Sequence, residues 1–162
     1  MSALTYQLFA LLAGWLEALL YARRGAGSFT YNEHIGYTLQ RVAVWLLVPV
    51  ALAEAHWLGW WVAAELLPAG LLFPLVHDEA YNFTRLWLDC RAQLDTGLGI
   101  LVPAADRDRG ALRLAWQQYR YGYQSATTTA RNDFNGRQRT WLAVAGVLVL
   151  SVGATALLLI AK

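Results

Sequence analysis

Four apolar blocks, each of about 20 residues, constrain this sequence more than any other feature. They cover approximately residues 3–22, 36–55, 57–76 and 141–161. A helix rises about 1.5 Å per residue, so about 20 apolar residues match the roughly 30 Å of hydrocarbon in a bilayer. Only 15% of the residues are charged, against about 25% in soluble domains. The sequence therefore predicts an all-α integral membrane protein with four transmembrane helices, forming a single membrane domain over residues 1–162.

The arginines predict how these spans are oriented. Every arginine follows the first or the third block, and the opposite side of the predicted bundle carries only the terminal Lys162. Basic residues are retained on the cytoplasmic side of a membrane protein. We therefore expect both termini to lie outside, the arginine-rich connections to lie in the cytoplasm, and the chain to be a multi-pass protein of the cell's inner (plasma) membrane.

The connection between the third and fourth spans, approximately residues 89–139, is the one long segment outside the predicted membrane region. Glycine and proline predict a loop over residues 96–110. Leu112, Trp116 and Tyr119 then recur at helical spacing opposite a basic stripe, which predicts an amphipathic helix within 111–130. This helix either lies on the anionic inner leaflet or packs as a cytoplasmic helix on its neighbours. Because acidic residues are spread among the arginines, a nucleic-acid partner is not expected.

Two ionisable residues within the apolar blocks are the first candidates for function, because charge in hydrocarbon is costly. Glu17 precedes Arg23 by about 9 Å of helix, which places its carboxylate below the interface. Arg41 and Glu54 are separated by only about 18 Å of helix, less than the hydrocarbon thickness, so Arg41 must dip inside. On adjacent antiparallel helices these side chains fall at similar depth. We therefore predict an intramembrane ion pair between Glu17 and Arg41.

The end of the third block adds polar groups at the same predicted interface. His77, Tyr81 and Arg85 share one helical face, and Asp78 lies on the neighbouring face. Together with the predicted ion pair, they indicate a cytoplasm-facing polar pocket that binds or translocates an ion or small molecule. The predicted binding residues are Glu17, Arg41, His77, Asp78, Tyr81 and Arg85.

A second hypothesis is a membrane-embedded, metal-dependent enzyme. His34 and His77, with Glu33 and Glu79, offer the nitrogen and oxygen ligands that zinc, iron or manganese accept. A b-type haem held by the same two histidines is a weaker form of this hypothesis. The single cysteine, Cys90, excludes an internal disulfide and a cysteine-cluster metal site.

A third hypothesis is a non-catalytic membrane subunit that binds a partner protein or anionic lipid. Small residues in the fourth block, including Gly146 and Gly153, favour close helix contact, either within the monomer or in a homo-oligomer. No nucleophile elbow or phosphate-binding loop is present in the sequence. The polar residues can also be read as helix caps and a structural ion pair. The sequence thus predicts a fold class and leaves the function open.

Overall fold

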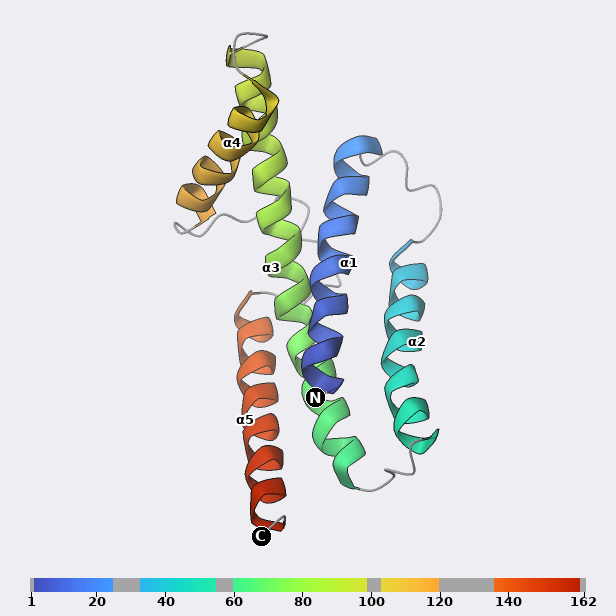
Figure 1. Ribbon diagram of the computed structural model, residues 1–162. Helices are drawn as coiled ribbons and strands as arrows, with labels where there is room; N and C mark the ends of the chain where they lie inside the picture. The colour runs from blue at the N-terminus through green and yellow to red at the C-terminus, as the bar shows by residue number, and fades with distance from the viewer. Residues whose placement is uncertain (1, 25–32, 55–59, 99–102, 120–135, 161–162) are drawn as a thin grey trace.

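The computed structural model is all-helical over the residues that it describes, which are 2–24, 33–54, 60–98, 103–119 and 136–160 (Figure 1). Within these ranges there is no strand. The prediction of an all-α fold is therefore confirmed. The five helices are α1 (Ser2–Arg24), α2 (Glu33–Glu54), α3 (Trp60–Leu98), α4 (Ala104–Tyr119) and α5 (Gly136–Ile160).

The central element is α3, and each of the other helices contacts it (Figure 1). It has 39 residues and is therefore about 58 Å long, which exceeds the roughly 30 Å of hydrocarbon in a bilayer. In the view of Figure 1, α1 and α2 are drawn to the right of α3, and α4 and α5 to its left. Both chain termini lie toward the end of α3 that begins at Trp60, and the α3–α4 hairpin forms the opposite end.

The closest helix contact is between α1 and α3, and small residues make it. Ala10, Gly14 and Ala18 recur at every fourth position of α1 and are buried. A Cβ atom added to Gly14 would stand 2.3 Å from the backbone carbonyl oxygen of His77, so only glycine fits there. Spacings of this kind let helix backbones approach closely where van der Waals packing drives association. The sequence contains this small-residue spacing in α1 as well as in the fourth apolar block.

The small residues of α5 also face α3. A Cβ atom on Gly146 would lie 3.0 Å from Leu72, and one on Gly153 would lie 3.1 Å from the Cβ of Ala64. Within the described residues, this face of α5 therefore serves packing inside the chain. A homo-oligomer formed through the fourth span stays a prediction, and it would have to use the exposed valine and leucine face of α5.

The connection after the third apolar block is more helical than the sequence predicts. The third span is expected to end near residue 76, but α3 continues to Leu98, and α4 begins inside the predicted 96–110 loop. Pro103 precedes α4, and its carbonyl accepts hydrogen bonds from the backbone N–H groups of Asp106 and Arg107. Gly110 lies within α4 and faces Leu94 of α3. The two residue types that indicated a loop instead begin a helix and allow close packing.

Within the predicted amphipathic segment, α4 packs on α3, and residues 120–130 lie outside the described residues. Leu86 and Cys90 of α3 and Ala111 and Ala115 of α4 form a buried cluster. Ion pairs flank it, from Arg91 to Asp108 at 3.0 Å and from Arg107 to Asp95 at 2.7 Å. Leu112 and Trp116, which we expected on one face with Tyr119, are about half exposed, because alanines occupy the contact with α3.

Two helical segments, Ala3–Ala22 and Gly136–Ala156, are long and apolar enough to cross a membrane. Only 33% and 22% of these segments are buried inside the protein. A core helix of a soluble protein would be mostly buried, so these two surfaces are apolar and outward-facing. Two such segments do not by themselves establish four membrane spans.

We expect Gly14→Ala to destabilise the protein, because the added methyl group meets the backbone of α3 rather than a side chain that can move. Overpacking typically costs about 1 to 3 kcal/mol, and a clash with backbone belongs at the upper end. Thermal unfolding of the detergent-purified protein measures the loss. Gly70→Ala is the matched control, since its Cβ would meet only the Trp45 ring nitrogen at 3.6 Å. Equal melting temperatures for the two variants would contradict the close α1–α3 contact.

Candidate functional site

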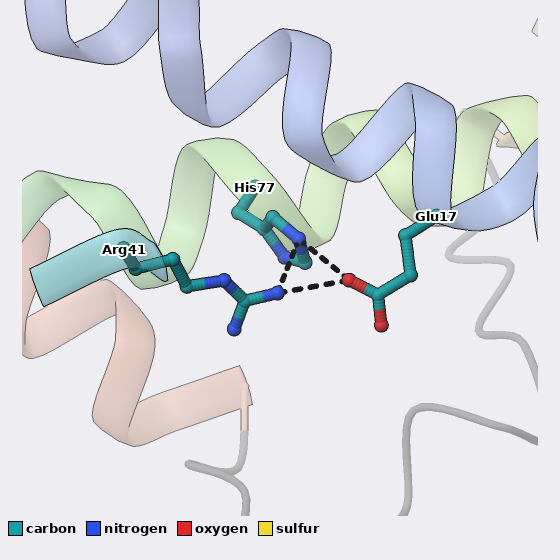
Figure 2. A network of polar contacts seen from close by, with 3 residues as sticks. All are labelled: Glu17, Arg41 and His77. Atoms are coloured by element: carbon teal, nitrogen blue, oxygen red, sulfur yellow. Dashed lines mark hydrogen bonds and ion pairs between the residues drawn. The ribbon is translucent and has the colours of Figure 1, made fainter. Parts of the chain in front are cut away.

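Three helices each contribute one polar side chain to a common contact, here called the triad (Figure 2). Glu17 comes from α1, Arg41 from α2 and His77 from α3. The Nη2 atom of Arg41 lies 2.8 Å from Oε2 of Glu17 and 2.8 Å from Nε2 of His77. The third edge, from Nε2 of His77 to Oε2 of Glu17, is 3.1 Å. The same three atoms therefore form a closed triangle of polar contacts.

Aromatic side chains of α1 and α3 position the triad. Phe73, one turn before His77, stacks on the imidazole with ring centroids 5.4 Å apart, and the Arg41 guanidinium lies 5.3 Å from the centre of the Phe73 ring. The Tyr6 hydroxyl donates a hydrogen bond of 2.9 Å to the backbone carbonyl of Arg41. Stacking limits the rotation of the imidazole and guanidinium planes. Arg41 is thus held at its backbone and at its side chain.

The triad is only partly buried. The side chains of Arg41 and Glu17 are 28% and 24% exposed, and that of His77 is 13% exposed. A fully sealed ion pair would be inaccessible to any ligand, whereas these values leave part of each charged group at the surface of the helix bundle. The triad is therefore not sealed within the described part of the chain.

A second polar pair lies next to the triad on the other side of α3. Asp78 forms a salt bridge with Arg139 of α5 and also accepts a hydrogen bond from Asn82 at 3.1 Å. Both charged side chains are largely buried, at 18% and 10% exposed. In the sequence, Arg139 falls at the end of the predicted connection between the third and fourth spans. Its role depends on the register of α5 against α3, which a single sequence does not reveal.

The remaining predicted binding residues lie farther along α3. Tyr81 is buried at the contact with Gly14, where α1 and α3 approach most closely. Arg85 stacks over the ring of Tyr21 at 4.9 Å and lies 4.0 Å from Asp89. The structure therefore brings Glu17, Arg41 and His77 together and leaves the other predicted residues in neighbouring contacts.

Two polar contacts near the opposite end of α1 are not indicated by the sequence. The carboxylate of Glu65 accepts a hydrogen bond of 2.8 Å from the backbone N–H of Ala3, and so caps the first turn of α1. Gln7 donates to the carbonyl oxygens of Ala3 and Ala69. Glu65 and Gln7 therefore connect α1 to α3 by hydrogen bonds, in addition to the small-residue packing.

The candidate metal ligands are not brought together in the described part of the chain. The side chains of His34 and Glu33 lie outside the described residues, and Glu79 is exposed. No group of three His, Cys, Asp or Glu side chains among the described residues could hold a metal ion. The Nε2 atom of His77 faces the Arg41 guanidinium, whose positive charge opposes a cation at that nitrogen. A zinc, iron or manganese site, or a haem, stays a prediction.

We expect the Glu17–Arg41 contact to stabilise the fold more than a more exposed ion pair with a similar distance between its nitrogen and oxygen atoms. Hydrogen bonds to charged groups contribute about 1.5 to 3 kcal/mol, whereas exposed salt bridges contribute about 0 to 1 kcal/mol. A double-mutant cycle of Glu17→Gln and Arg41→Gln, measured by unfolding in detergent, gives the coupling energy. The cycle of Asp95→Asn and Arg107→Gln is the control, since that pair is 2.7 Å apart and its carboxylate is 45% exposed, against 24% for Glu17. A coupling no larger than the control would contradict a structural contribution of the triad.

Comparison with known proteins leaves the function to be argued from these residues. No family model, curated protein or solved structure matches the chain. A fold alone does not determine an activity, and function must be inferred from the chemistry of a site.

Proposed function

We propose that this chain is a small polytopic membrane protein of the inner (plasma) membrane, and that the triad is its binding site for an ion or small molecule. In this proposal the chain crosses the membrane four times, with both termini outside and the α3–α4 hairpin in the cytoplasm. An ion is the favoured ligand, because the triad is a compact set of charged groups in hydrogen-bond contact.

The outward-facing apolar surface supports the membrane placement. Large hydrophobic side chains project from three helices with about half or more of their area exposed, including Leu8 at 60%, Leu47 at 62% and Val152 at 69%. Such continuous apolar surface is rare on soluble monomers and is typical of helices that face lipid. It involves α2 as well as the two segments that are long and apolar enough to cross a membrane.

The direction of the Arg41 side chain supports the proposed orientation. The backbone carbonyl of Arg41 accepts a hydrogen bond from Tyr6, and its guanidinium reaches Glu17. Along α1, Glu17 lies about 16 Å beyond Tyr6. The side chain therefore extends toward the end of the bundle that carries the α3–α4 hairpin. Arginines inside membranes extend in this way toward the nearer interface.

The single observation that carries the proposal is the triad itself. Within the described residues, three ionisable side chains from separate helices meet with their polar atoms at hydrogen-bond distance. Ionisable groups at such positions are costly and commonly mark ion or proton pathways. The metal-dependent enzyme remains an alternative that the described residues do not favour.

A second candidate function is binding of the anionic inner leaflet by α4. Leu112 and Trp116 are 50% and 56% exposed, and Arg109 and Arg113 are exposed beside them. Trp116 lies against Phe83 with ring centroids 6.1 Å apart. Phe83 is about 9 Å beyond His77 along α3, which is where an interfacial tryptophan is expected if the triad lies within the membrane. A partner subunit at this face is the corresponding alternative.

The proposed topology predicts that opposite ends of the bundle are accessible from opposite sides of the membrane. In a Cys90→Ser background, a membrane-impermeant maleimide is expected to label Ser2→Cys on intact cells. It is expected to label Asp106→Cys only after the membrane is opened. Labelling of both sites from the outside, or of Asp106→Cys alone, would contradict the proposed orientation.

Ion binding at the triad predicts charge movement that depends on Glu17. Proteoliposomes on a solid-supported membrane are exposed to concentration jumps of sodium, potassium, chloride and protons. At least one jump is expected to produce a transient current, and Glu17→Gln is expected to lose most of it because the ligand-binding carboxylate is absent. Asp106→Asn is the control, since it removes an exposed carboxylate of α4. No current with any of these ions, or equal currents in both variants, would overturn the proposal.

A further inference from the structure

We infer that a water molecule binds at the side-chain amide oxygen of Gln7, in the contact between α1 and α3. This site lies apart from the triad, and water at Gln7 is independent of whether the triad binds an ion. Gln7 is only 9% exposed. One end of its amide is hydrogen-bonded within the protein, and the other end is the atom that binds the water.

Two backbone carbonyls determine which way the amide of Gln7 is turned. Its Nε2 atom donates to the carbonyl oxygens of Ala3 at 3.2 Å and of Ala69 at 3.1 Å. Carbonyl oxygens can only accept, so exchanging the nitrogen and oxygen of the amide would bring three acceptors together. Both hydrogens of Nε2 are therefore used, and Oε1 remains as an acceptor with two lone pairs.

The described residues supply no hydrogen for Oε1 of Gln7. This atom is buried and, within the described part of the chain, no donor is in hydrogen-bond contact with it. Two donors of the first turns of α1 are engaged elsewhere. The Tyr6 hydroxyl donates to the carbonyl of Arg41. The backbone N–H of Ala3 donates to Glu65. A buried acceptor is costly when nothing donates to it, so the donor comes from a bound molecule.

The surroundings of this amide are apolar. Residues of α1 on either side of Gln7 and the residues of α3 that it meets form one buried cluster, composed of Ala3, Tyr6, Ala10, Ala69 and Phe73. Pro68, next to Ala69, is also fully buried. Where the protein supplies no partner to a polar atom in such surroundings, an ordered water commonly does so.

A second acceptor lies next to the carbonyl that Gln7 contacts. Pro74 is inside α3 and has no N–H, so the carbonyl of Gly70 lacks its helical donor. Gly70 follows Ala69, whose carbonyl accepts from Gln7. Carbonyls that proline frees in this way are satisfied by neighbouring side chains or by ordered water. We therefore assign the two hydrogens of the water to Oε1 of Gln7 and to the carbonyl of Gly70.

These acceptors identify the ligand as a small, neutral hydrogen-bond donor. Oε1 of Gln7 and the carbonyl of Gly70 offer only lone pairs, so an anion gains nothing from them. A monovalent cation would bring a full charge to two uncharged oxygens in apolar surroundings, which is costly. Water donates two hydrogens without adding charge, and bridging waters bond nearly as well as direct partners.

The water would lie along the contact of α1 with α3, on the Ala3 side of the triad. Gln7 lies beside Ala69 and is buried at the same helix contact as Gly14, which lies beside the His77 carbonyl. Gln7 precedes Glu17 by ten residues of helix, or about 15 Å. Water at Gln7 therefore hydrates a separate part of this contact and leaves the polar atoms of the triad untouched.

The test is water-edited solid-state NMR of the full chain in liposomes, with ¹³C-labelled glutamine and cysteine. At short mixing times, magnetisation from water protons reaches only carbons close to water. The side-chain carbonyl carbon of Gln7 is expected to gain signal several-fold faster than the β-carbon of Cys90, the single cysteine, which is 1% exposed. Gln117, which is exposed on α4, is the hydrated reference. A build-up at Gln7 as slow as that at Cys90 would overturn the bound water.

Loss of one glutamine signal in Gln7→Met assigns the carbon that is measured. If that variant does not fold, replacing each of the six other glutamines assigns the same signal by elimination. The spectra are recorded in sodium chloride, in potassium chloride and in N-methylglucamine chloride. Equal build-up in the three salts supports a neutral water. A Gln7 carbonyl shift that requires sodium or potassium, without transfer from water, would assign the site to a cation and overturn the inference.

Discussion

The close contact of α1 with α3 is the constraint on which the rest of the structure depends. Gly14 brings the backbone of α1 against the His77 carbonyl, and this approach allows the Glu17 carboxylate, less than one turn later, to reach the imidazole on the same helix face. A side chain at position 14 would move the helices apart and lengthen that edge of the triad. Packing and chemistry are therefore coupled at one position, and the site depends on a residue that has no functional group.

Hydrogen bonds between helices give the contacts of α1 and α2 with α3 their register. Glu65 accepts from the N–H of Ala3, Gln7 donates to the carbonyl of Ala69, and the Trp45 ring donates to the carbonyl of Leu66. In an apolar surrounding, sliding one helix by a turn would leave each of these groups without a partner, at a cost of roughly 1 to 3 kcal/mol per group. In the proposed membrane placement, apolar faces alone would permit several registers, because lipid and a neighbouring helix offer similar packing.

The parts of the site that were predictable from sequence are those governed by helix geometry within one element. The rise per residue places Glu17 and Arg41 at similar depth, and spacing along α3 places His77 near the same level. The partner of Asp78 was not predictable, because Arg139 reaches it only through the register of α5, which Gly146 and Gly153 determine by their contacts with α3.

The face of α4 that packs on α3 was likewise not predictable from the sequence. Its hydrophobic periodicity correctly indicated a helix, but a pattern of apolar residues does not distinguish a face that packs from a face that stays exposed. The structure buries Ala111 and Ala115, since small side chains let α4 approach α3, and leaves Trp116 outward. Within a single helix, residue size decided the packed face more than hydrophobicity did.

The attachment of α2 to the rest of the bundle involves the triad. Much of its apolar surface, including Leu39 and Leu47, faces outward, and few of its residues contact α3. Its described polar links to the bundle pass through two residues, Arg41 and Trp45. In the proposed four-span arrangement, an exposed leucine gains little by moving from lipid onto another helix, so these polar links would govern where α2 lies. Since Arg41 is both an attachment of α2 and a member of the triad, the position of α2 and the geometry of the triad depend on the same side chain.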